Sequence, residues 1–219
     1  MDQVREKPWL AHYDPGVPPE IQVPDIPLWR FLEESARRFP QNVALEFLGK
    51  TLSYQELWGL ARRFAQGLKD LGVRPGDRVA IMLPNSPQFV IAFYGTLLAG
   101  GVGVNVNPLY TPRELRHQLA DAGAETLVIL DHLLPRYLEV EKEVPVKRVV
   151  VTGIQDYLPF PKNLLYPLKA KRDGLPLGFP KREGFHAFAE LLKRPPAEPH
   201  VPDPEDLALL QYTGGTTGL

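Results

Sequence analysis

The sequence contains no cysteine, which excludes disulfide bonds, thiolate metal sites and a cysteine nucleophile. Serine is also scarce: only Ser35, Ser53 and Ser86 are present, and none lies in the Gly-x-Ser-x-Gly turn of serine hydrolases. The chain opens without the cationic and apolar leader of a secreted protein. We therefore expect a cytoplasmic protein.

An excess of positive charge is missing as well. The 219 residues include 25 basic and 26 acidic side chains, and the formal net charge is −1. Nucleic-acid-binding surfaces are typically strongly basic, so no nucleic-acid partner is expected. The five histidines form no ligand pair at helical spacing, and no two carboxylates are placed for paired acid–base catalysis. The sequence carries no signal of oligomeric state.

The stretch from 79 to 112 has no Asp, Glu, Lys or Arg. Its part from Phe89 to Val106 is long enough to cross a bilayer, but Gly100-Gly101 and scattered polar residues interrupt it. A buried helix followed by a buried parallel strand requires the same composition, because helices cover both faces of such a sheet. We interpret the stretch as protein core.

Helix and strand signals alternate along the chain. Helices are predicted over Pro27–Phe39, Ser53–Gly72, Ser86–Gly100, Thr111–Gly123 and Phe185–Lys193. A hairpin of Asn42–Phe47 and Lys50–Leu52 is predicted, followed by strands over Arg78–Leu83, Val102–Val106, Thr126–Leu130, Arg148–Thr152 and Asp206–Thr213, the last of them buried. The first helix places its apolar stripe at Leu28, Phe31, Leu32, Ala36 and Phe39. This alternation predicts an α/β fold: a doubly wound, mainly parallel sheet flanked by helices.

Two helix starts carry a capping box, in which a hydroxyl residue and a glutamate three positions later satisfy each other's free backbone N–H groups. They are Ser53 with Glu56, and Thr111 with Glu114.

Residues 155–183 lose the alternation and are predicted to be irregular. They contain six basic and three acidic residues, with several prolines and aromatics. One interpretation is a peripheral contact with the inner face of the membrane; the other is a surface loop whose aromatic side chains cover the local core. Because a net charge of +3 is modest for attraction to anionic lipid, the surface loop is favoured.

The last residues form a loop rich in glycine and threonine, Tyr212-Thr213-Gly214-Gly215-Thr216-Thr217-Gly218-Leu219. Its glycines lack Cβ, so the backbone can approach a ligand closely, and successive N–H groups in such a turn form a concave anion site. The threonine hydroxyls can donate to phosphate oxygens or ligate Mg²⁺. The loop lacks the lysine of the Walker pattern, and the Rossmann glycine pattern is absent around Gly101.

This loop resembles the phosphate loop of the AMP-forming superfamily of acyl-CoA synthetases, luciferases and peptide-synthetase adenylation domains. Three other segments are similar to that superfamily's core segments: 52–57, 72–80 and 98–108. The segment 105–115, Asn-Val-Asn-Pro-Leu-Tyr-Thr-Pro-Arg-Glu-Leu, looks most like medium- and long-chain fatty acyl-CoA synthetases. In the family the loop continues with Lys-Gly after another residue or two, whereas this chain stops at Leu219.

The resemblance implies a reaction in two steps, with ATP, Mg²⁺ and coenzyme A. A fatty acid and ATP give acyl-AMP and pyrophosphate, and coenzyme A then gives acyl-CoA and AMP. By position, the ATP-binding residues would be Thr213, Gly214, Gly215, Thr216, Thr217 and Gly218, with Thr216 on the metal. Tyr212 is expected to pack beneath the loop rather than react.

By the same resemblance, residues 1–219 are the N-terminal portion of a large adenylation domain. It comprises an extended lead-in (1–27), an α/β core (28–154), the insertion (155–184) and a return to the core and phosphate loop (185–219). The remainder of that domain, a C-terminal lid and the residues that carry out catalysis are expected downstream, so residues 1–219 alone are expected to be inactive.

Two alternatives stay open at this point. The acid activated could be an aryl acid or an amino acid, since the pocket that selects it is expected downstream. A non-catalytic α/β interaction module that ends in a glycine- and threonine-rich turn would also fit the residues.

Overall fold

Six parallel strands form the central sheet of the computed structural model, which describes residues 7–213. They are β3 (Arg78–Met82), β4 (Val102–Asn105), β5 (Thr126–Leu130), β6 (Arg148–Thr152), β7 (Phe185–Ala187) and β8 (Leu209–Gln211). Their order is β7-β6-β5-β3-β4-β8, and every pair is parallel. The chain runs from β3 outward to β4 and then returns to the other side of β3 for β5. This doubly wound sheet confirms the predicted fold class.

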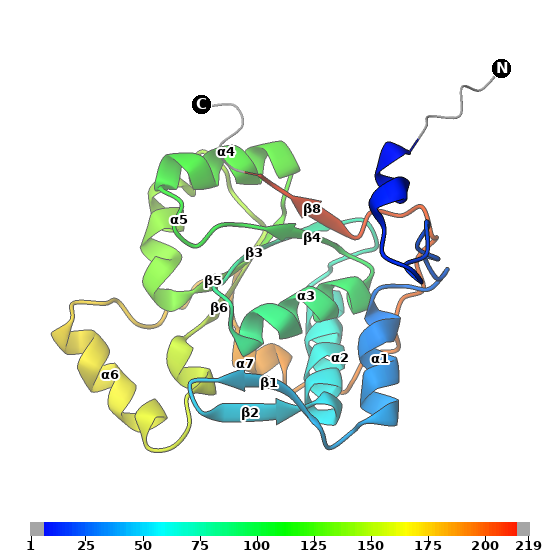
Figure 1. Cartoon of the computed structure of the whole chain (residues 1–219). Helices are drawn as coiled ribbons and strands as arrows, with labels where there is room; N and C mark the ends of the chain where they lie inside the picture. The colour runs from blue at the N-terminus through cyan, green and yellow to red at the C-terminus, as the bar shows by residue number, and fades with distance from the viewer. Residues whose placement is uncertain (1–6, 214–219) are drawn as a thin grey trace.

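Helices cover both faces of the sheet (Figure 1). On one face lie α1 (Trp29–Arg38), α2 (Tyr54–Asp70), α3 (Pro87–Ala99) and α7 (Phe188–Leu191), and on the other lie α4 (Pro112–Ala122) and α5 (Leu134–Val140). Crossovers between parallel strands are right-handed. The step from β3 to β4 and the step from β4 to β5 run in opposite directions across the sheet, so the helices that make them, α3 and α4, lie on opposite faces. Short 3₁₀ helices occupy Pro8–His12, Asp131–Leu133 and Ile154–Tyr157.

The charge-free stretch is core, as predicted. Strand β3 is fully buried from Val79 onward, and Ile91 and Leu98 of α3 have no exposed surface. Among the residues that the structure describes, no helix combines the length and apolarity needed to cross a membrane.

The predicted helix starts are confirmed with their caps. Glu56 N–H donates to Ser53 Oγ (3.2 Å) while Ser53 N–H donates to Glu56 Oε2 (2.7 Å). The same reciprocal pair joins Thr111 and Glu114 at the start of α4 (3.4 and 2.8 Å). Gly123 ends α4 with φ of +61°, a left-handed conformation that glycine adopts without steric cost.

The predicted hairpin is formed by the antiparallel strands β1 (Val43–Phe47) and β2 (Lys50–Ser53). Phe47 pairs with Lys50, so Leu48 and Gly49 form a two-residue turn. Both have positive φ (52° and 96°), as the tight hairpin turn requires.

The predicted apolar stripe of the first helix is wrong in part. Leu28, Phe31 and Phe39 are each 46% exposed, whereas Trp29, Leu32 and Ala36 are buried. The indole of Trp29 sets this rotation: its Nε1–H donates to the carbonyl of His200 (3.0 Å), and its ring stacks near that of Trp58 (6.3 Å between centroids).

The predicted irregular segment 155–183 contains a helix, α6 (Lys162–Arg172). The sequence pattern missed it because Pro167 lies inside the helix and the side that packs on the protein carries Ala170 rather than leucines. The helix lies at the side of the molecule opposite α1 and away from α4 (Figure 1).

Two further predictions are corrected at the ends of the sheet. The segment Phe185–Lys193 begins as strand β7, parallel to β6, and only its middle is helical, as α7. The last strand spans Leu209–Gln211 and is half-buried, not buried, and Leu207 is 59% exposed. Three-residue strands are too short to show a periodicity, and β8 has a neighbour on one side only within the described residues.

Candidate functional site at the carboxyl ends of β4 and β8

The reversal of strand order around β3 and β4 marks where a ligand would bind. In doubly wound sheets the crevice lies outside the carboxyl ends of the strands at such a switch point. Strand β8 pairs with β4 in parallel register, from Gly103 with Leu209 to Asn105 with Gln211. The residues that follow β8 therefore emerge beside the residues that follow β4.

Of the six predicted ATP-binding residues, the structure describes Thr213 alone, and its side chain is exposed two residues after β8. The others, Gly214, Gly215, Thr216, Thr217 and Gly218, lie outside the described residues, and so does the predicted metal ligand Thr216.

Three amide side chains meet at the end of β4. Asn105 Nδ2 donates to Gln211 Oε1 (2.8 Å), which joins β4 to β8 beyond their backbone ladder. Gln118 Nε2, from α4, donates to the carbonyl of Asn105 (2.8 Å). The carboxyl end of β4 is thus fixed to a strand on one side and a helix on the other.

Two buried acceptors at this position, Asn105 Oδ1 and Gln118 Oε1, have no hydrogen-bond donor within the described part of the chain. Buried polar atoms without a partner are uncommon in folded proteins. The end of β4 therefore offers two acceptors to N–H or O–H groups from outside residues 7–213.

The residue after β8, Tyr212, packs its ring against the hydrophobic core, and its hydroxyl donates a hydrogen bond to Asp121 of α4. Burial, the hydrogen bond and the negative charge of Asp121 together raise the pKa of Tyr212 to about 12. This agrees with a structural role for Tyr212. Its packing relative to the loop stays a prediction, because that loop lies outside the described residues.

Two sets of hydrogen bonds hold the connection from β4 to α4. Asn107 Oδ1 accepts from the N–H of Leu109 (3.0 Å), which forms a local turn. Arg136 of α5 donates to the carbonyls of Pro108 (2.6 Å) and Tyr110 (3.0 Å). The guanidinium of Arg136 thus holds the connection from β4 to α4 against α5.

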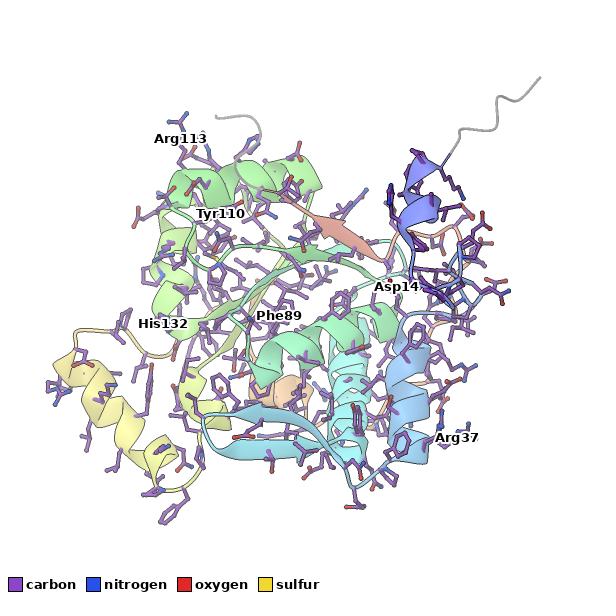
Figure 2. The ribbon with its side chains drawn as sticks, viewed as in Figure 1. Asp14, Arg37, Phe89, Tyr110, Arg113 and His132 are labelled. Carbon is purple, nitrogen blue, oxygen red and sulfur yellow. The ribbon has the colours of Figure 1, made fainter. Side chains whose placement is uncertain are left out.

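A cavity of about 460 Å³ lies beside Tyr212, between α4 and the connection before it. Figure 2 places Tyr110 and Arg113 on this side of the molecule, and Asp14 of the lead-in on the opposite side. Arg116 is paired with Glu143 (2.5 Å), whereas Arg113 lines the cavity without a carboxylate partner within residues 7–213. Arg113 and the Thr213 hydroxyl are suitable donors for phosphate oxygens.

A second cavity of similar volume, about 470 Å³, lies at the amino ends of the strands, between Gly76, Gly101 and His200. Ligands of doubly wound sheets bind at the other edge. We therefore place the candidate site at the carboxyl ends of β4 and β8.

Sequence reasoning missed the residues that hold this site together. Asn105, Gln118, Asp121 and Arg136 come from three different elements, and their contacts depend on how α4 and α5 pack. In the sequence, the site was predicted from the loop after β8, and the segment 105–115 was noted only for its resemblance to fatty acyl-CoA synthetases, with no role for these side chains.

Comparison with known proteins shows the same family across nearly the whole chain. Residues 32–219 match the family model described as AMP-binding enzyme. A long-chain-fatty-acid–CoA ligase of Bacillus subtilis is 43% identical over 97% of the chain, and 4-coumarate-CoA ligase 1 of Narcissus pseudonarcissus is 32% identical over 92%. The chain spans 39% and 33% of the lengths of these two relatives.

Among solved structures, a long-chain-fatty-acid-CoA ligase from Archaeoglobus fulgidus superposes with a TM-score of 0.72 and 26% identity. That match covers 91% of this chain and 37% of the other.

Proposed function

Since this chain belongs to the family of AMP-binding enzymes, we propose that it is part of an ATP-dependent ligase that converts a long-chain fatty acid to its coenzyme A thioester. The observation that carries the proposal is the 43% identity to a long-chain-fatty-acid–CoA ligase over 97% of the chain. The pairing of β8 with β4 supports it, because it brings Thr213, where the predicted loop begins, to the carboxyl edge of the sheet beside the switch point.

The proposed reaction proceeds by two substitutions. A carboxylate oxygen of the fatty acid bonds to the α-phosphorus of ATP, and the bond to the bridging oxygen of the β-phosphate breaks, which releases pyrophosphate. The thiol of coenzyme A, as it loses its proton, then bonds to the acyl carbon, and AMP leaves. Both steps depend mainly on positioning and on neutralising phosphate charge.

We assign the triphosphate to the loop Thr213–Gly218, with the described residues fixing where that loop begins. Arg113 and Thr213 would donate to phosphate oxygens, and the contact of Tyr212 with Asp121 would hold the base of the loop. Thr216 would be the protein's hydroxyl ligand for Mg²⁺, which when bound neutralises charge on the triphosphate.

We further propose that residues 1–219 are the first portion of a larger adenylation domain. The relatives are more than twice as long as the matched part, since the chain spans 39% of the Bacillus ligase. The acyl pocket, the coenzyme A site and the residues that carry out catalysis would lie in the remaining length.

An aryl acid is the second candidate substrate, and the observation that favours it is the 32% identity to 4-coumarate-CoA ligase 1. Its lower identity makes the fatty acid the better supported substrate.

The test is an assay of pyrophosphate release by the whole protein with a panel of saturated fatty acids, 4-coumarate and amino acids. We expect kcat/KM to be at least about tenfold higher for a long-chain fatty acid than for any other acid, since burial of each additional methylene in a pocket favours the longer chain. A preference for 4-coumarate would overturn the substrate assignment but retain the ligase. Pyrophosphate release by residues 1–219 alone would overturn the domain assignment.

The matched variants are Thr213→Ala and Thr51→Ala. Both remove an exposed threonine hydroxyl, but Thr51 lies in β2, outside the candidate site. We expect Thr213→Ala to raise the KM for ATP severalfold and Thr51→Ala to leave it unchanged. Equal values for the two variants would argue against a phosphate site after β8.

A further inference from the structure

The outward side of α6 is apolar, which is the reverse of an ordinary surface helix. Leu164, Leu165 and Leu168 are 65%, 57% and 68% exposed, while Ala170 on the opposite side is 1% exposed. Solvent-facing helix sides are normally polar, with the leucines directed to the core. A row of three exposed leucines on one helix therefore points to a surface that is covered by something else.

Two residues outside the helix extend this apolar surface. Phe160, just before α6, is 79% exposed, and Leu48 at the turn of the β1–β2 hairpin is 57% exposed. The amine of Lys162 donates to the carbonyl of Leu48 (3.3 Å), which holds the hairpin turn against the start of α6. We call Leu48, Phe160, Leu164, Leu165 and Leu168 the apolar patch.

The charges around the apolar patch have one sign. From Tyr157 to Arg172 the chain has four basic residues and no acidic residue. Lys162, Lys169, Lys171 and Arg172 are all exposed. At helical spacing Lys162 and Lys169 lie on one margin of the leucine row and Lys171 on the other, while Arg172 follows Leu168 by one turn at the end of the row. Of the two acidic residues that bound the segment, Asp173 is paired with Arg172 (3.2 Å), and Asp156 accepts hydrogen bonds from Thr152 and from the N–H of Gly153.

We propose that α6 and the adjoining hairpin turn dock on the surface of an anionic phospholipid bilayer. The leucines and Phe160 enter the boundary between headgroups and acyl chains, and the four basic side chains contact lipid phosphates. This arrangement, an apolar stripe with lysines and arginine at its margins, is that of helices that lie in the membrane interface. The proposal rests on the geometry of α6 and is independent of the reaction proposed above.

The basic side chains around the apolar patch favour an anionic lipid surface over a protein partner. Residues 157–172 have a charge of +4, and the pairing of Arg172 with Asp173 leaves Lys162, Lys169 and Lys171 without a carboxylate partner within residues 7–213. Near an anionic membrane each lysine or arginine adds about fivefold to the binding constant. The three lysines without a carboxylate partner in the described part of the chain, together with the apolar patch, provide the two signals, basic and apolar, that membrane attachment requires.

The first experiment is flotation of the whole protein, and of residues 1–219 for comparison, with vesicles of equal parts phosphatidylglycerol and phosphatidylcholine and with vesicles of phosphatidylcholine alone. Binding by residues 1–219 but not by the whole protein would mean that the rest of the protein covers the apolar patch, and would overturn the proposal. We expect binding to the anionic vesicles that weakens as salt is added, and much weaker binding to the neutral ones. Absence of binding to the anionic vesicles at low salt would overturn the proposal.

Two pairs of matched variants separate charge from apolar contact. Lys169→Glu with Lys171→Glu should reduce binding at least about 25-fold, whereas the same charge change at Arg37 and Arg63, on α1 and α2, should have little effect. Leu164→Ser with Leu168→Ser should reduce binding about tenfold or more. Ile21→Ser with Val23→Ser, which changes two side chains of the lead-in that are 87% and 85% exposed, should leave it unchanged.

The absence of cysteine allows a direct test of insertion. In residues 1–219, which contain no cysteine, a single Leu168→Cys substitution carries an environment-sensitive fluorophore at one place only, and Val201→Cys, at a side chain 69% exposed in the connector before β8, is the control. We expect the emission at 168 to shift to the blue with anionic vesicles and the emission at 201 to stay constant. Equal shifts at both positions would overturn docking through α6.

Circular dichroism and the urea midpoint of each variant check that it is folded. A protein partner is the competing occupant. If the leucine variants abolish self-association in size-exclusion chromatography while vesicle binding is unchanged, the apolar patch is a contact between copies of the chain and the lipid proposal is wrong.

Discussion

The hydroxyl of Tyr212 donates a hydrogen bond to the carboxylate of Asp121, and this contact joins the residue after β8 to the last turn of α4. Helix α4 begins with the capping box of Thr111 and Glu114 beside the same cavity. One helix thus contacts both sides of the candidate site, and the start of the predicted phosphate loop is positioned by it.

The ionisation of Tyr212 tests this contact. Its pKa is raised from 10.0 to about 12, so the contribution of the contact to stability is fully present below pH 10 and is lost as the pH rises through about 12. Asp121→Asn removes the negative charge and should lower the pKa of Tyr212. The measurement is the ultraviolet absorbance of tyrosinate against pH, with Tyr212→Phe identifying the signal that belongs to this residue. An Asp121→Asn curve identical to that of the unchanged protein would contradict the contact.

The two capping boxes provide a matched pair for separating stability from function. Thr111→Ala and Ser53→Ala each remove a cap hydroxyl, and each should lower the free energy of unfolding by about 1 kcal/mol in urea titrations. Only Thr111 lies beside the candidate site, so only Thr111→Ala should also raise the KM for ATP in the whole protein. An equal effect of both substitutions on KM would mean that loss of stability alone explains it.

The same caps predict how stability responds to acid. Hydrogen bonds from the backbone and side chain of Ser53 lower the pKa of Glu56, and those from Thr111 lower the pKa of Glu114. A carboxylate with a lowered pKa contributes stability above its ordinary value of 4.5, and this contribution is lost as the pH falls through the lowered value. Glu56→Gln and Glu114→Gln should therefore flatten the decline of the urea midpoint below about pH 4.5. A decline as steep as that of the unchanged protein would show that other carboxylates dominate.

Sequence patterns predicted the elements whose signals are local. The caps at Ser53 and Thr111 and the charge-free core stretch all depend on residues within a few positions of one another. The parallel, doubly wound sheet was predicted from the alternation of helix and strand signals along the chain.

The features that were predicted wrongly or missed depend instead on tertiary contacts, which a local sequence pattern does not contain. Trp29 rotated α1 away from the predicted stripe because its indole has a partner 171 positions later, the carbonyl of His200. Helix α6 was not predicted from the sequence, because its leucines face outward and not toward the core. The site was predicted only through the loop after β8, whereas Asn105, Gln118 and Asp121 acquire their roles from the pairing of β4 with β8 and the packing of α4.

Two glycines provide a final test of the packing of α2 against α3. A Cβ at Gly95 of α3 would lie 2.7 Å from Cδ1 of Phe64 and 3.0 Å from the carbonyl of Ala61, both in α2, so Gly95→Ala should cost about 1–3 kcal/mol of unfolding free energy. Gly59, in α2 itself, has no heavy atom within 4 Å of the added Cβ. Gly59→Ala should raise stability by about 0.5–1 kcal/mol, because alanine loses less conformational freedom in a helix. Urea titrations of the two variants measure both changes, and a neutral Gly95→Ala would show that α2 and α3 can separate without cost.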